Sequence, residues 1–135
     1  MAKMEWQAIY SVNVSKMDAQ HKQLFKLIAD LHDAMSQKKG ESVVANTVKQ
    51  LRSYTVTHFS EEEALLAKHN YPALAMQKKL HQEFVGKVEQ IEKDLKAGGK
   101  LVAVNVMMML NEWLLGHITK VDKQYGPFLN EKGEK

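Results

Sequence analysis

Four apolar stripes with helical spacing constrain the fold of this 135-residue chain more than any other feature. In each stripe, apolar side chains recur at alternating intervals of three and four residues, the period of one buried helix face. The stripes run from Met17 to Met35, Val44 to His69, Leu74 to Leu95 and Ala103 to Val121. No alternation of apolar and polar residues, as strands show, competes with them.

Short turn segments separate the stripes, with glycine or proline at 38–40, 70–72, 98–99 and 126–127. Short connections make neighbouring helices antiparallel. The sequence therefore predicts one all-α domain spanning residues 1–135, an up-down-up-down antiparallel four-helix bundle with an N-terminal arm. The expected elements are an arm at 1–16, helices at about 18–38, 41–69, 72–97 and 100–122, and a tail at 123–135. The lysine- and glutamate-rich part of the tail after Asn130 should be frayed.

Residues at the expected boundaries agree with this division. Asp18 can cap the first helix, Pro72 suits the first turn of the third, and Gly40 and Gly98 suit helix ends.

Composition excludes several kinds of site. The chain has no cysteine, so disulfides, iron–sulfur clusters and thiolate zinc sites are ruled out. A net charge of +3 with a single arginine argues against nucleic-acid binding. The N-terminus lacks the pattern of a signal peptide. The longest apolar stretch, 102–110, is interrupted by Asn105 and is too short to span a bilayer. We expect a soluble, cytoplasmic protein without membrane insertion.

Polar residues interrupt the stripes at one height of the predicted bundle. At 1.5 Å per residue, all of them lie roughly 5–15 Å from the same end, on four different helices. They are His21, His58, Glu62, Gln77, His81 and His117.

This layer favours a metal site inside the bundle. His58 and Glu62 are four residues apart and share one helix face, so one helix can supply two ligands to a dinuclear centre. Imidazole and carboxylate without thiolate suit iron, manganese or zinc. Any one of these histidines alone would more often be a satisfied core residue, and Glu62 alone could be exposed. Taken together, four histidines and a carboxylate in one layer favour the metal.

Asp122 follows His117 by five residues, which places the two about 140° apart on a regular helix. Two alternatives remain open from spacing: an exposed aspartate at the helix end, or a π-like widening that turns Asp122 inward. His32 and His69 lie at other heights and should not reach the site. The methionines at 107–109 suit core packing.

An ordered set of motifs resembles the hemerythrin family, specifically the single-domain bacterial hemerythrins, from Trp6 to Pro127. The motifs are D-A-Q-H at 18–21, H-F-S-E-E at 58–62, Y-P at 71–72, H-Q-E-F at 81–84, and H-I-T-K-V-D at 117–122 followed by Tyr125.

The resemblance implies a centre of two iron ions with an oxo or hydroxo bridge that binds dioxygen reversibly. It implies that His21 and His58 hold the iron with the open position, that Glu62 and Asp122 bridge, and that His81 and His117 hold the other iron. It also implies an apolar dioxygen pocket over the open position, lined by Leu24, Phe59, Trp113 and Leu114.

Gln77 departs from the family, which has a third histidine at this position. A neutral amide oxygen is a poorer ligand for iron than imidazole. Three outcomes are open: Gln77 ligates weakly, water takes the place, or that iron binds poorly. A second open place on this iron could also destabilise the oxygenated form.

The resulting hypothesis is a non-enzymatic dioxygen carrier or store, monomeric, that delivers to an unidentified oxygen-accepting protein. The alternatives are a di-iron oxidase or peroxidase, a dioxygen or redox sensor, and a metal-free bundle that binds a partner. The ferritin-like oxidases use E-x-x-H on two helices. The sequence contains no E-x-x-H, which argues against that class of oxidase.

Overall fold

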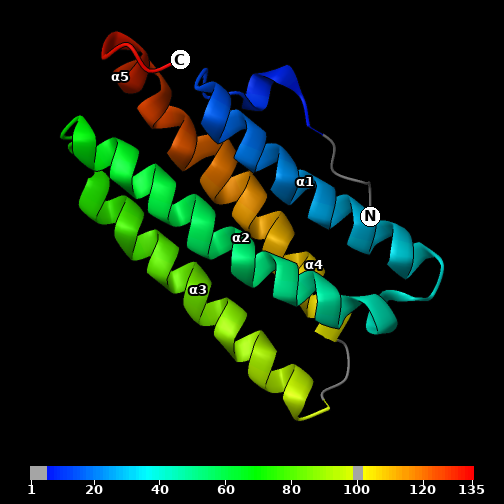
Figure 1. Cartoon of the computed structure of the whole chain (residues 1–135). Helices are drawn as coiled ribbons and strands as arrows, with labels where there is room; N and C mark the ends of the chain where they lie inside the picture. The colour runs from blue at the N-terminus through cyan, green and yellow to red at the C-terminus, as the bar shows by residue number, and fades with distance from the viewer. Residues whose placement is uncertain (1–5, 99–101) are drawn as a thin grey trace.

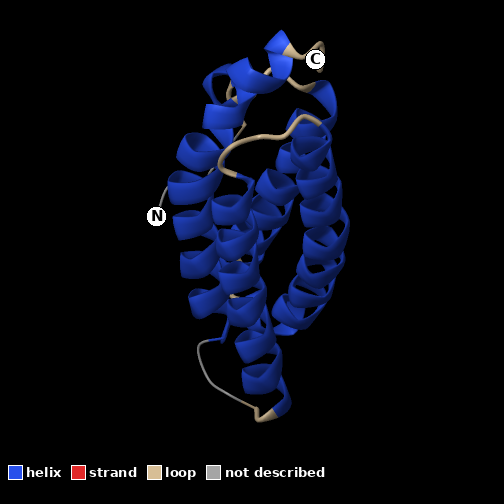
Figure 2. Ribbon diagram, turned by 90° about the vertical axis from the view of Figure 1, so that its left-hand side faces the viewer, coloured by secondary structure: helices blue, strands red, loops and turns tan. Residues whose placement is uncertain are grey.

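Four long helices form the body of the protein in the computed structural model, which describes residues 6–98 and 102–135 (Figure 1). Helix α1 spans Ser15–Ser36, α2 Gly40–Lys68, α3 Leu74–Lys96 and α4 Val102–Trp113. Both α1 and α3 lie against α2 and α4. Figure 2 shows helices and loops, and no strand occurs in the described ranges. The predicted all-α four-helix bundle is confirmed.

The fourth helix continues past Trp113 in altered forms. A π-helical segment, η2, spans Leu114–Val121, and a 3-10 turn, η3, spans Asp122–Gln124. A short helix, α5 (Tyr125–Glu131), follows. The segment predicted as a tail at 123–135 therefore contains a helix, which ends at Glu131, close to the point after which fraying is expected. Its apolar face explains the order, because Tyr125 and Leu129 are fully buried.

The ends of the first three helices are set by residues with left-handed backbone. Lys38, Asn70 and Gly98 have φ of 61°, 56° and 71°, each just beyond the last helical turn. The Lys39 and Tyr71 amides donate back to carbonyls five residues earlier, at 2.7 and 2.9 Å, which closes the ends of α1 and α2. Gly98 behaves as expected, whereas Gly40 begins α2 and Lys38 makes the turn.

The N-terminal arm covers the end of the bundle that carries α5. It contains a 3-10 turn, η1 (Ala8–Tyr10), and passes into α1 at Ser15. Asp18 accepts hydrogen bonds from the Val12 amide at 2.8 Å and from the Ser11 hydroxyl. Asp18 thus anchors the arm from the first turn of α1, and the prediction that it caps the helix is wrong, since Val14 is the cap residue.

The arm and the C-terminal segment form one small core. Val12 and Val14 pack with side chains from α1, α2 and α5: Met17, Leu66, Tyr125 and Leu129.

Pro72 lies in the turn before α3 rather than inside its first turn, since α3 begins at Leu74. None of the described helices combines the length and apolarity that a bilayer-crossing segment needs.

Gly126 marks the tightest contact between the arm and α5. A Cβ at this position would lie 2.6 Å from the Val12 carbonyl oxygen, a backbone atom that has little freedom to move. We expect Gly126→Ala to lower the free energy of unfolding by about 1–3 kcal/mol through overpacking. Urea unfolding followed by circular dichroism measures the change.

Gly86 provides the matched control, because a Cβ there would meet nothing within 4 Å and the residue lies inside α3. Gly86→Ala should be neutral or raise stability by up to about 1 kcal/mol through helix propensity. Equal unfolding midpoints for the two variants would contradict the close approach of the arm to α5.

Candidate metal centre

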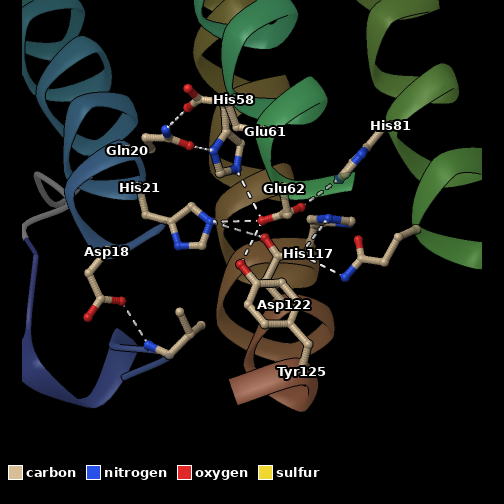
Figure 3. A network of polar contacts seen from close by, with 12 residues as sticks. Asp18, Gln20, His21, His58, Glu61, Glu62, His81, His117, Asp122 and Tyr125 are labelled. Atoms are coloured by element: carbon tan, nitrogen blue, oxygen red, sulfur yellow. Dashed lines mark hydrogen bonds and ion pairs between the residues drawn. The ribbon is translucent and has the colours of Figure 1, made fainter. Parts of the chain in front are cut away.

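Six ionisable side chains meet inside the bundle, near the end that the arm and α5 cover (Figure 3). Each is at most 4% exposed. Helix α1 contributes one, α2 two, α3 one, η2 one and η3 one: His21, His58, Glu62, His81, His117 and Asp122. The structure therefore brings together the four histidines and Glu62 of the predicted layer, and it adds Asp122, whose direction the spacing left open.

Glu62 lies at the middle of the cluster and contacts three helices. Its Oε2 is 3.3 Å from His58 Nε2 and 3.6 Å from His21 Nε2. Its Oε1 is 3.0 Å from His81 Nε2. One carboxylate thus faces imidazoles on both sides, which is the arrangement of a bridging ligand.

Asp122 occupies the corresponding place on the other side of the cluster. Its Oδ2 is 3.3 Å from His21 Nε2, and its Oδ1 is 2.9 Å from His117 Nε2. The π-helical segment makes this possible: the Asp122 amide donates to the His117 carbonyl, five residues back, so both side chains share one face. Of the two alternatives left open by the spacing, the inward-facing aspartate is the one found.

The six residues form two overlapping sets of four. Each residue offers one ligand atom, and the atoms of a set all lie within 4.8 Å of one another. One set is His21, His58, Glu62 and Asp122; the other is Glu62, His81, His117 and Asp122. The two carboxylates belong to both sets, which is the donor pattern of a dinuclear centre.

Unsatisfied buried atoms show that these sets suit cations. Within residues 6–98 and 102–135, several of the converging atoms make no hydrogen bond although their neighbours are close: His21 Nε2, Glu62 Oε1, His81 Nε2, His117 Nε2 and Asp122 Oδ2. Buried polar atoms normally have partners. Atoms that converge without hydrogen-bond geometry fit metal ligands, and imidazole with carboxylate suits iron, manganese or zinc.

Charge balance inside the cluster points the same way. Burial opposes ionisation, but the nearby Asp122 and Glu62 carboxylates prevail and raise the pKa of His21 to about 9. Burial also opposes the ionisation of Glu62, but the nearby His58 and His21 hold the pKa of this carboxyl well below its ordinary value. The metal-free cluster therefore balances carboxylates with protons on imidazoles. A bound cation would replace those protons.

Hydrogen bonds around the cluster orient two of the imidazoles. His58 Nδ1 pairs with the Gln20 amide oxygen, and Gln20 Nε2 donates in turn to Glu61. His81 Nδ1 donates to Glu63 Oε2 at 2.8 Å. Both contacts leave Nε2 facing the centre, which is how outer partners fix metal-binding histidines. Sequence reasoning missed these roles, although Glu63 directly follows Glu62 and Gln20 directly precedes His21.

Two tyrosines lie against the cluster with different hydrogen bonding. The Tyr125 hydroxyl donates to Glu62 Oε2 at 2.6 Å. The Tyr54 ring stacks on His58 with 5.1 Å between centroids, but its buried hydroxyl has no hydrogen-bond partner in the described part of the chain. Tyr54 precedes His58 by one helical turn, a spacing that could have identified it.

Gln77 lies inside the same cluster, and 1% of its surface is exposed. Its Nε2 donates to Asp122 Oδ1 at 3.0 Å. Its Oε1 is buried and has no partner among the described residues.

Two of the four apolar residues expected to form a pocket contact the cluster directly. Leu24, Phe59 and Leu114 belong to the main core, and Trp113 packs against it. The Phe59 ring stacks on His81 at 3.9 Å, and the Trp113 ring stacks on His117 at 3.8 Å. Aromatic faces therefore cover two of the imidazoles directly.

The two remaining histidines lie elsewhere, as expected. His69 pairs with Glu134 at 2.9 Å, near the C-terminus. His32 lies 4.0 Å from Asp33, its neighbour on α1. Neither belongs to a metal-capable set in the described ranges.

The tyrosine pair yields a prediction for the metal-free protein. Tyr125→Phe removes a donor to a buried carboxylate, so the free energy of unfolding should fall by about 1.5–3 kcal/mol. Tyr54→Phe removes only an unsatisfied hydroxyl and should be neutral or slightly stabilising. Urea unfolding compares the two. Equal losses would show that the Tyr125–Glu62 hydrogen bond contributes nothing specific.

Comparisons with known proteins agree with this geometry. The family model of the hemerythrin HHE cation binding domain matches residues 12–129. A bacteriohemerythrin of Methylococcus capsulatus is 35% identical over 96% of this chain and 99% of its own length. One of Pseudomonas aeruginosa is 32% identical, covering 93% of this chain and 80% of its own.

The likeness extends to animal proteins and to solved structures. A myohemerythrin of Riftia pachyptila is 29% identical over 89% of this chain and 88% of its own length. A crystal structure of wild-type hemerythrin superimposes with a TM-score of 0.83 at 35% identity, covering 93% of this chain and 97% of that one. The chain belongs to the hemerythrin family.

Proposed function

We propose that this protein binds dioxygen reversibly at a di-iron centre formed by the six clustered residues. The observation that carries the proposal is the pair of overlapping ligand sets, each with two imidazoles and both carboxylates, inside a buried layer. The relatives named bacteriohemerythrin and myohemerythrin support iron as the metal. When bound, the iron pair would supply the redox chemistry by which dioxygen is taken up and released.

In this proposal each residue of the cluster has a defined role. His21 and His58 would hold one iron, and His81 and His117 would hold the other. Glu62 and Asp122 would be shared between the two positions, since each carboxylate approaches imidazoles of both sets. Tyr125 donates a hydrogen bond to Glu62 and fixes the orientation of that bridge.

The apolar side chains around the cluster would exclude water. Leu24 and Leu114 are fully buried, and Phe59 is 6% exposed. Closure against water strengthens the interactions of the charged ligands and keeps protons from the bound gas. This role suits a carrier or store, in which bound dioxygen must leave unchanged.

An enzymatic role is the second candidate, and Gln77 is the observation that favours it. An amide lies beside Asp122, at the position where the family resemblance implies an imidazole. A weaker ligand set at one iron would favour oxidation of the centre over release of dioxygen. A di-iron oxidase or peroxidase would then result.

A loading cycle separates the two candidates. The protein is loaded with ferrous iron without air, exposed to air and then deoxygenated, while iron content and visible absorption are followed. We expect two irons per chain and an absorption band that appears in air and disappears on deoxygenation. A band that fails to appear, or ferric iron that deoxygenation does not reverse, would contradict reversible binding.

Replacement of the shared carboxylate should affect both metal positions. Glu62→Gln removes a charged oxygen from both sets, so we expect at most one tightly bound iron per chain instead of two. Iron analysis after gel filtration measures this. Glu89→Gln is the control, because that carboxylate is exposed on α3 beside Arg52. Retention of two irons by the Glu62 variant would contradict the bridging role.

A further inference from the structure

The hydrogen bonding of the Gln77 side-chain amide is a feature that the proposed function does not require. Gln77 lies on α3 one turn before His81, so both side chains face the cluster. Its Nε2 donates to Asp122 Oδ1 at 3.0 Å, while its Oε1 is buried without a partner in the described ranges. A donor in use and an acceptor left over on one buried amide require an explanation.

The chemistry of the two partners fixes the orientation of the amide. An ionised carboxylate only accepts hydrogen bonds, so the NH2 group of Gln77 must face Asp122. The amide nitrogen has no lone pair available for a metal. Turning the amide over would replace a charge-assisted hydrogen bond with a contact between two oxygens. The arrangement therefore opposes ligation by Gln77.

The two metal positions then have equal numbers of protein ligands. One has His21 and His58 with the two carboxylates, and the other has His81 and His117 with the same carboxylates. The oxo or hydroxo bridge that the family resemblance implies would add a fifth ligand at each position. A metal that prefers six ligands would then have one place left at both positions, open to solvent or a small molecule. A water in that place would also donate a hydrogen bond to Gln77 Oε1, which has no partner among the described residues.

We propose that Gln77 is a positioning residue that holds the bridging carboxylate Asp122 through its N–H, and that the His81/His117 position consequently keeps an exchangeable coordination place. The inference rests on the two-metal centre of the proposed function but not on dioxygen chemistry. Small anions such as azide should therefore bind at either metal. The chain thus differs from a centre in which only the His21/His58 position is open.

Cobalt and azide test the inference without iron or dioxygen. The metal-free protein is loaded with Co2+, and azide is then titrated while the visible cobalt bands and the heat of binding are recorded. We expect two cobalt ions and two azide ions per chain. Gln77→His supplies an imidazole to the second position, so that variant should bind two cobalt ions and only one azide.

A third variant separates positioning from ligation. Gln77→Leu has no ligand atom and no donor. If Gln77 positions Asp122, this variant still binds two azide ions, and its cobalt affinity falls by about 10–100-fold, the usual effect of losing an outer hydrogen bond. If Gln77 is instead a ligand, the wild type binds one azide and the leucine variant binds two. That second result would overturn the inference.

Gln90 is the matched control, since its Nε2 also donates to an aspartate four residues away, Asp94 Oδ1, at 3.1 Å on the exposed face of α3. Gln90→His and Gln90→Leu should leave cobalt and azide binding unchanged. Circular dichroism confirms that each variant is folded. Fewer than two cobalt ions in the wild type would overturn the metal centre itself, whereas two cobalt ions with one azide in every protein would overturn only the role of Gln77.

Discussion

The burial of Glu62 among imidazoles from three helices is the interaction on which the rest of the structure depends. A lone carboxylate at 1% exposure would be strongly destabilising. His21, His58 and His81 compensate its charge, and Tyr125 donates to it at 2.6 Å. Because these partners come from α1, α2, α3 and α5, one carboxylate sets the relative positions of most of the bundle.

The irregular parts of the fold follow from the second carboxylate. A regular helix would turn Asp122 away from His117, and the π-helical segment brings both onto one face. After the π-helical segment and the η3 turn, the chain forms a new helix, α5. Gly126 of α5 leaves room for the Val12 carbonyl of the arm. The arm and α5 therefore do more than close the bundle: they keep Tyr125 in contact with the cluster.

The sequence predicts the bundle and the cluster well because both have simple periods. Stripes spaced by three and four residues define buried helix faces, and polar residues at one height of those faces must meet. The limits have physical causes as well. Spacing alone leaves two options for Asp122, because a π-helix depends on tertiary contacts. The anchoring role of Asp18 and the partners of Gln20 and Glu63 arise between elements, which periodicity does not describe.

The position of the metals is the most direct test of the account. Crystals of the iron-loaded protein, measured at the iron absorption edge, would locate the ions by anomalous scattering. We predict two peaks, one touching His21 and His58, the other touching His81 and His117, and both touching Glu62 and Asp122. A single peak, or none among these six residues, would contradict it.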